Sequence, residues 1–189
     1  CSSDLYLDIG SNIGNHAIYF SKFFKQIKCF EPQKQTYKIL QLNTHYHENI
    51  ESFNYGIDLE NRSIDFYIPR NNLGMASSVK INDSEIIIEK VLLKPIESDK
   101  FINVGFIKID VEGNELRVLQ SLEEIIVRDK PIIFVELNHT EMKYKILEYL
   151  EYLGYHDFYI NRQITYKSFL LSLFSSPFLK KVSKRFILN

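Results

Sequence analysis

Carboxylate side chains stand at the ends of four apolar runs of the chain. They are Asp8, Glu31, the pair Asp110 and Glu112, and Glu136. Carboxylates can hold the hydroxyl groups of a ribose, bind a cationic group, or take a proton from a reacting hydroxyl. The opposite ends of these runs carry no matching set of acids. The pattern therefore predicts one acidic site built from several strands, although each acid could also be an unrelated helix cap.

The first acid, Asp8, lies at the end of a predicted strand, just before a turn that is typical of a ligand site. Leu5–Ile9 is an apolar run that predicts a buried strand, and it stops at Gly10. The turn Gly10–Gly14 then leads into a predicted helix. In open α/β sheets the ligand crevice lies at such strand ends, where the next helix offers free N–H groups.

The residues of this turn restrict the ligand. Asn12 stands where a dinucleotide fingerprint has its second glycine, and no Gly-Lys-Ser/Thr follows, so pyrophosphate and Walker-type sites are disfavoured. Asp8 would repel phosphate but suits an ammonium group. S-adenosylmethionine carries an ammonium and a sulfonium and no phosphate, and we predict it as the cofactor. The alternative is that Asp8 only caps a helix and the glycines only turn the chain.

The second acid supports the cofactor prediction. Ile27–Phe30 ends in Glu31 and Pro32, close to the interval of about 20 residues at which such folds place a ribose-binding carboxylate. Pro32 stops the strand and opens a helix that starts near Gln33. We expect Glu31 to bind the ribose hydroxyls.

Four motifs, in order, resemble the signature of FkbM-type S-adenosylmethionine-dependent methyltransferases: Asp8–Gly14 (DIGSNIG), Phe30–Pro32 (FEP), Gly74–Ser78 (GMASS) and Ile107–Glu115 (IKIDVEGNE). The resemblance spans Leu5 to Gly154. Members of this family are class I methyltransferases that mostly methylate hydroxyl oxygens, often on sugars. The resemblance implies that the cofactor is held by Asp8, Gly10, Asn12, Gly14, Glu31 and Pro32, with Asp110, Glu112 and Gly113 beside the transferred methyl.

The third acidic run carries the predicted catalytic residues. A weak hydroxyl nucleophile gains on the order of 10²–10⁴-fold from a positioned base. We expect Glu112 to be that base and Asp110 to orient the cofactor or the acceptor, with the reverse assignment open. His139 follows the fourth run and is predicted as a base or a donor to the substrate, unless it caps a helix.

The expected fold is α/β: a Rossmann-like class I methyltransferase fold with a mostly parallel sheet flanked by helices. Further strands are predicted from Val104, at Pro131–Val135 and at Tyr155–Ile160, and a helix at Asn114–Val127. Apolar runs at Ile64–Ile68 and Glu85–Leu93 predict a β-hairpin insertion, whose connecting segment 71–78 is a candidate for acceptor contact. We divide the chain into a methyltransferase domain, residues 1–160, and a C-terminal helical tail, residues 161–189.

The composition fits one enzyme domain. The chain has 189 residues, of which 45% are hydrophobic, and a formal net charge of −1 without a basic stripe, which argues against nucleic acid as a partner. Cys1 and Cys29 provide neither a disulfide framework nor zinc-ligand spacing, so we predict reduced thiols, a cytoplasmic protein and no metal site. Because the chain opens at Cys1, almost on the first strand, we expect a fragment of a longer protein.

The tail joins an apolar run, Phe169–Phe174, to the basic-apolar segment Phe178–Leu188. The apolar run is too short to cross a bilayer. We expect the tail to pack on its own domain or in a homo-oligomer, with attachment to a membrane surface through its basic residues as the alternative.

The predicted reaction is methyl transfer to a hydroxyl oxygen of a small molecule, with a sugar or glycan as the first choice by resemblance. Three other classes stay open. An N-methyltransferase acting on adenine is expected to show an Asn/Asp-Pro-Pro-aromatic run after the fourth strand, where this chain has Ile109-Asp110-Val111-Glu112. A catalytically silent Rossmann-like scaffold would bind no adenosyl ligand. An NAD-linked oxidoreductase would bind NAD, although Asn12 argues against it.

Overall fold

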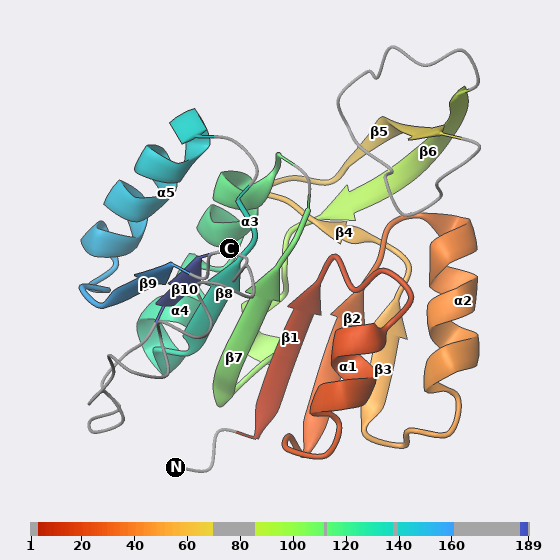
Figure 1. Cartoon of the computed structure of the whole chain (residues 1–189), viewed down its shortest axis with the longest axis horizontal. Helices are drawn as coiled ribbons and strands as arrows, with labels where there is room; N and C mark the ends of the chain where they lie inside the picture. Colours follow the sequence, from red (N-terminus) through yellow and green to blue (C-terminus); the bar gives the residue numbers. More distant parts are fainter. Residues whose placement is uncertain (1–3, 70–85, 112, 138–139, 161–185, 189) are drawn as a thin grey trace, which may run out of the picture.

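The computed structural model describes residues 4–69, 86–111, 113–137, 140–160 and 186–188. Its centre is a seven-stranded sheet with strand order β3-β2-β1-β7-β8-β10-β9, in which neighbouring strands are parallel (Figure 1). The strands are β1 (Leu5–Ile9), β2 (Gln26–Phe30), β3 (Ile50–Phe53), β7 (Val104–Ile109), β8 (Ile132–Val135), β9 (Phe158–Ile160) and β10 (Phe186–Leu188).

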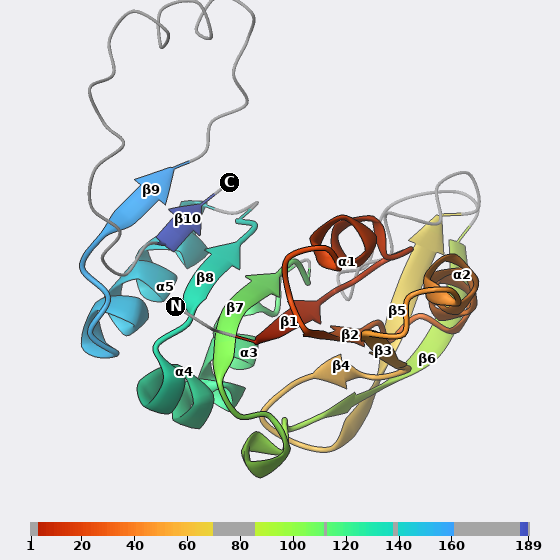
Figure 2. The ribbon, with the colours of Figure 1, turned by 90° about the horizontal axis from the view of Figure 1, so that it is seen from below.

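Helices cover both faces of this sheet. They are α1 (Asn15–Phe20), α2 (Lys34–Thr44), α3 (Glu115–Ser121), α4 (Glu123–Asp129) and α5 (Thr140–Tyr152). Figure 2 shows α1 on one face and α4 on the other. The sheet flanked by helices confirms the predicted Rossmann-like fold class.

The alternation of side chains along β1 divides the core in two. Leu5, Leu7 and Ile9 belong to a large apolar cluster that includes residues of α3, α4 and α5. Tyr6 points the other way and packs with Ala17 of α1 in a smaller cluster. Every residue of β1 is buried, as expected for a central parallel strand.

The strand order places a ligand crevice between β1 and β7. The chain builds outward from β1 to β3 and then returns to place β7 on the other side of β1. Where the strand order reverses in this way, the connections after the two central strands leave in opposite directions and open a crevice at their carboxyl ends.

The predicted hairpin is present. β5 (Arg62–Pro69) and β6 (Ile86–Lys94) pair antiparallel, and the short β4 (Gly56–Ile57) joins β6 in a second, three-stranded sheet. Figure 1 shows this small sheet beyond the arrowheads of β1 and β2, above the carboxyl edge of the large sheet. The predicted acceptor segment 71–78 lies outside the described residues.

One predicted helix is divided in the structure. Residues 114–127 form α3 and the start of α4, with a break at Leu122. Leu119, Leu122 and Ile126 are all fully buried on both sides of the break. Glu123 and Glu124 then lie in the first turn of α4, where the helix dipole favours acids.

The C-terminal end also differs from its prediction where the structure describes it. Phe186–Leu188, assigned to a helical tail, form β10 between β8 and β9. Three successive apolar residues suit a strand flanked by neighbours on both sides. Residues 161–185 lie outside the described part, so the domain division at residue 160 stays a prediction. None of the described helices has the length and apolar content that a bilayer crossing requires.

Candidate functional site

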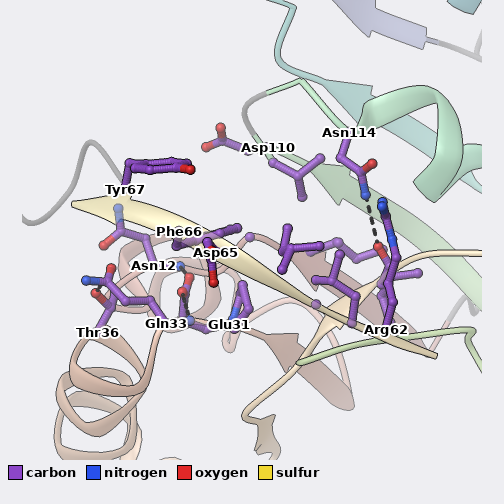
Figure 3. A pocket seen from close by; sticks show the side chains of 18 of the residues that line it. Asn12, Glu31, Gln33, Thr36, Arg62, Asp65, Phe66, Tyr67, Asp110 and Asn114 are labelled. Carbon is purple, nitrogen blue, oxygen red and sulfur yellow. Dashed lines mark hydrogen bonds between the residues drawn. The ribbon is translucent and has the colours of Figure 1, made fainter. Parts of the chain in front are cut away.

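A cavity of about 660 Å³ lies at the carboxyl edge of the sheet, between the ends of β1, β2 and β7 and the hairpin strand β5. This volume is in the range of small-molecule sites. Figure 3 shows side chains from the glycine turn, the start of α2, β5 and the β7 loop gathered around it. The lining residues are Ile9, Gly10, Asn12, Glu31, Pro32, Gln33, Thr36, Gly56, Ile57, Arg62, Ile64, Asp65, Phe66, Tyr67, Leu93, Asp110, Val111, Asn114 and Glu136.

The turn after β1 is held against the β7 loop. Gly10 has φ +76°, and a Cβ atom built on it would lie 1.8 Å from the carbonyl oxygen of Asp110. Only glycine tolerates both this backbone conformation and this approach. The backbone N–H groups of Gly10 and Ser11 both donate to the carbonyl of Phe30, at 3.0 and 3.1 Å. The turn is thus fixed to β2 and β7 together.

Glu31 is placed in the cavity wall by the end of β2. One of its carboxylate oxygens accepts the backbone N–H of Asn12 at 3.0 Å, and the other accepts the backbone N–H of Gln33 at 2.9 Å. Burial raises the pKa of Glu31 to about 7, although these two hydrogen bonds pull it down. A carboxylate offers about four acceptor positions, so Glu31 keeps capacity for a ligand's hydroxyl groups.

A buried lysine connects the two other predicted acids. Lys108 stands directly opposite Asp8 in the β1/β7 register. Its Nζ donates to the carbonyl of Gly10 at 3.0 Å and lies 3.3 Å from Asp110 Oδ2 and 3.5 Å from Asp8 Oδ1. Burial alone would lower the pKa of Lys108, but the two carboxylates outweigh it and raise that pKa. Lys108 is therefore a cation. We call these groups the Lys108 cluster.

A second ionic cluster ties the hairpin to α3. Asp58 is fully buried and accepts hydrogen bonds from Arg62 Nε at 2.9 Å, Arg117 Nε at 2.7 Å and the backbone N–H of Leu59 at 2.6 Å. Burial raises the pKa of Asp58, but the two guanidinium groups outweigh burial and hold it below its usual range. We call this the Asp58 cluster. It fixes Arg62, a lining residue, at the start of β5.

The predicted site residues fall into three groups. Gly10, Asn12, Glu31, Pro32 and Asp110 all line the cavity. Asp8 and Gly14 are not among the lining residues, and Glu112 and His139 lie outside the described residues. Asp8 and Asp110 nevertheless lie on either side of Lys108 Nζ, at 3.5 and 3.3 Å, and Glu31 lines the same cavity as Asp110.

Asp8 and Gly14 have other surroundings. Asp8 has no exposed surface and lies behind the turn, on the α1 face of β1. Gly14 has φ +90°, and a Cβ atom there would lie 2.7 Å from Leu40 Cδ1, so this glycine allows α1 and α2 to pack closely. Their predicted contact with the cofactor stays a prediction.

Several residues of the cavity wall were not predicted as site residues. Gln33 and Thr36 come from the start of α2, and Phe66 and Tyr67 from β5. Gln33 could have been predicted as a site residue, because it stands two residues after Glu31 in the turn that opens a helix. For β5 the signal was the apolar run Ile64–Ile68, which predicted a hairpin insertion. The side chains of β5 that line the cavity could not be named, because their direction depends on long-range contacts.

No group of three or more His, Cys, Asp or Glu side chains that could hold a metal ion occurs in the described ranges. Cys29 packs in β2 as predicted, and it is buried and free.

The comparisons with known proteins agree with this geometry. The family model described as "Methyltransferase FkbM domain" matches residues 8–156. A crystal structure of methyltransferase FkbM from Methylobacillus flagellatus KT is similar in fold, with a TM-score of 0.55 and 18% sequence identity over 80% of this chain. The match covers 37% of that longer chain. No curated protein sequence matches the chain. Because the family model covers most of the chain, including the glycine turn and the strand ends around the cavity, the protein belongs to the FkbM methyltransferase family.

Proposed function

We propose that this protein is an S-adenosylmethionine-dependent methyltransferase that methylates a hydroxyl oxygen of a small molecule, with a sugar or glycan as the first candidate. The observation that carries the proposal is the placement of Glu31. Its carboxylate is almost fully buried in the cavity wall, beside a glycine turn at the switch point of the sheet, and both of its oxygens keep acceptor capacity.

The residues around Glu31 fit the adenosyl group. Gly56 and Ile57 give the cavity an apolar side, and Gly10 brings the backbone to its edge without a side chain. The amide nitrogen of Gln33 is buried there without a hydrogen-bond partner in the described part of the chain. Glu31, Gly10 and Asn12 would hold the cofactor. Pockets that combine apolar walls with a few fixed polar groups are typical of small-molecule and cofactor sites.

When bound, the cofactor supplies an electrophilic methyl group on a positively charged sulfur. The protein's own part is to hold the acceptor oxygen in line and to take its proton. Asp110 lines the cavity and is 30% exposed, with Lys108 Nζ beside it. We infer that Asp110 either accepts this proton or orients the reacting groups. Glu112 and His139, outside the described residues, stay the alternative bases.

The β5 wall faces the acceptor in this proposal. Phe66 and Tyr67 offer apolar area, and Asp65 and Asp110 offer hydrogen-bond acceptors. A polyhydroxylated molecule needs both. The choice of a sugar rests on the family resemblance.

Methyl transfer tests the function directly. The purified chain is incubated with S-adenosylmethionine and a panel of sugars and sugar conjugates, and products are identified by mass spectrometry. The proposal expects one added methyl on a hydroxyl oxygen. Methylation of nitrogen or carbon alone would contradict the oxygen assignment, and binding of NAD without binding of S-adenosylmethionine would favour an oxidoreductase. Binding of no adenosyl ligand would favour a silent scaffold.

Two variants identify the base. Asp110→Asn and Glu112→Gln are compared for cofactor affinity and turnover. The variant of the base should keep its affinity and lose about 10²–10⁴-fold in turnover. Unchanged turnover removes that residue from the base role.

A further inference from the structure

Gln33 has a buried side-chain amide that is only partly used. The residue precedes α2 as its N-cap, but its side chain makes no capping hydrogen bond. It is 2% exposed and lines the cavity (Figure 3). A glutamine at a helix start that neither caps the helix nor reaches solvent needs another explanation.

Only one of the two polar atoms of this amide has a hydrogen-bond partner among the described residues. Gln33 Oε1 accepts the hydroxyl of Thr36 at 2.5 Å. Gln33 Nε2, which carries two N–H donors, has no partner within the described residues. With Oε1 accepting from Thr36, the donor end of the amide stays free. Buried polar groups are normally paired, so a free one in a cavity wall points to a ligand atom.

Gln33 stands close to the predicted ribose-binding acid. Its backbone N–H donates to Glu31 Oε1 at 2.9 Å, and both residues line the cavity. A hydroxyl group that donates its proton to Glu31 still has lone pairs with which to accept from Gln33 Nε2. A ribose hydroxyl is a group of this kind.

We propose that Gln33 is a second ribose-recognition residue, which donates a hydrogen bond to the hydroxyl that Glu31 accepts from. This inference rests on the proposed function, since it takes the adenosyl group as the ligand. It assigns to Gln33 a share of the affinity and a selectivity for ribose over deoxyribose. Thr36 is then a positioning residue, because it fixes the direction of the amide.

Calorimetric titration tests the proposal. The probes are S-adenosylhomocysteine, which cannot react, and its 2′-deoxy and 3′-deoxy analogues. Gln33→Met keeps the length of the side chain and removes its donor. We expect it to weaken S-adenosylhomocysteine binding about 5- to 10-fold, the usual contribution of one hydrogen bond. We also expect the penalty for one of the two deoxy analogues to shrink by a similar factor in the variant.

Two further variants control the experiment. Gln35→Met changes an exposed glutamine of the same helix and should bind as the wild type does. Gln33→Glu keeps an acceptor for Thr36 but loses the donor, and it should also weaken binding. The thermal unfolding midpoint of the ligand-free Gln33→Met protein is measured alongside, because the variant loses the acceptor of the Thr36 hydroxyl as well as the unpaired donor.

The outcomes separate this proposal from the proposed function. If the wild type does not bind S-adenosylhomocysteine, the proposed function fails. If the wild type binds and Gln33→Met binds equally well, the role of Gln33 is wrong. If Gln33→Met weakens binding but both deoxy penalties stay at their wild-type size, the amide contacts another part of the ligand and the ribose assignment is wrong.

Discussion

Two aspartates without exposed surface differ in how their charge is stabilised. Asp58 accepts hydrogen bonds from two guanidinium groups and a backbone N–H. Asp8 has no hydrogen bond of good geometry to any described residue, and its nearest cation is Lys108 Nζ at 3.5 Å. Accordingly, the pKa of Asp58 is lowered, whereas burial raises the pKa of Asp8.

This difference separates a structural cluster from a site cluster. In the Asp58 cluster the carboxylate and the two guanidinium groups pair with one another, and these contacts join β4 and β5 to α3. The Lys108 cluster shares one cation among Asp8, Asp110 and the carbonyl of Gly10, so it arranges the glycine turn without satisfying every acid. Incompletely satisfied buried charges are costly for stability, and they occur more often where a protein binds or reacts.

The largest expected effect comes from breaking the Lys108 cluster at its backbone. Gly10→Ala would drive a methyl group into the carbonyl of Asp110 and force an unfavourable φ. We expect a loss of about 3–5 kcal/mol in the free energy of unfolding, measured with urea, and loss of ligand binding. The control is Gly154→Ala, which has φ +87° and no atom within 4 Å of the added Cβ, and should cost about 1–2 kcal/mol. Equal losses would show that the approach of Gly10 to Asp110 is not needed.

Removing the carboxylate of the Asp58 cluster should have the next largest effect. Asp58→Ala leaves Arg62 and Arg117 without their shared acceptor, and we expect a loss of about 2–3 kcal/mol, since both guanidinium groups are over a third exposed and can take up water. Exposed Glu60 also binds Arg117, and Glu60→Ala should change stability by less than about 0.5 kcal/mol.

The pH dependence of Asp58→Ala checks the same cluster. A lowered pKa stabilises the fold above the unfolded pKa, and this contribution is lost as the pH falls through the folded value. The loss in free energy of unfolding of Asp58→Ala, relative to the wild type, should therefore be greatest at neutral pH and shrink in acid. A deficit that grows in acid would contradict the role of Asp58 as an ionised partner.

Asp8→Asn should change stability less than Asp58→Ala does, with the opposite pH dependence. Because the folded pKa of Asp8 is raised, the stability it contributes is present at low pH and lost as the pH rises through that value. The amide of the variant does not titrate. The free energy of unfolding of Asp8→Asn should therefore increase relative to that of the wild type as the pH rises. At neutral pH we expect a difference within about 1 kcal/mol in chemical unfolding. A loss as large as that of Asp58→Ala would remove the contrast between the two clusters.

The sequence predicted the features that depend on local order. The apolar run before Gly10 predicted β1 with its observed bounds, and the break at Glu31 and Pro32 predicted the end of β2. The convergence of these ends followed from the parallel arrangement. The strand boundaries are encoded within a few consecutive residues, and the convergence follows once the strands are taken as parallel neighbours.

Features that depend on pairing could not be predicted in this way. Lys108 stands beside Asp8 only because β7 pairs with β1 in one particular register across about 100 residues. The alternation along β1 then turns Asp8 toward α1, whereas Ile9 and Gly10 reach the cavity. The Asp58 cluster likewise needs α3 to lie against the hairpin, and the hydrophobic pattern of α3 does not specify its neighbour.

The account depends most on Glu31 as an ionised acceptor in an adenosyl site, and calorimetric titration with S-adenosylhomocysteine tests this directly. Since burial raises the pKa of Glu31 to about 7, the affinity of the wild type should rise about tenfold between about pH 6 and about pH 8. Glu31→Gln should bind more weakly and without this pH dependence. No binding by the wild type, or equal and pH-independent binding by both proteins, would contradict the account.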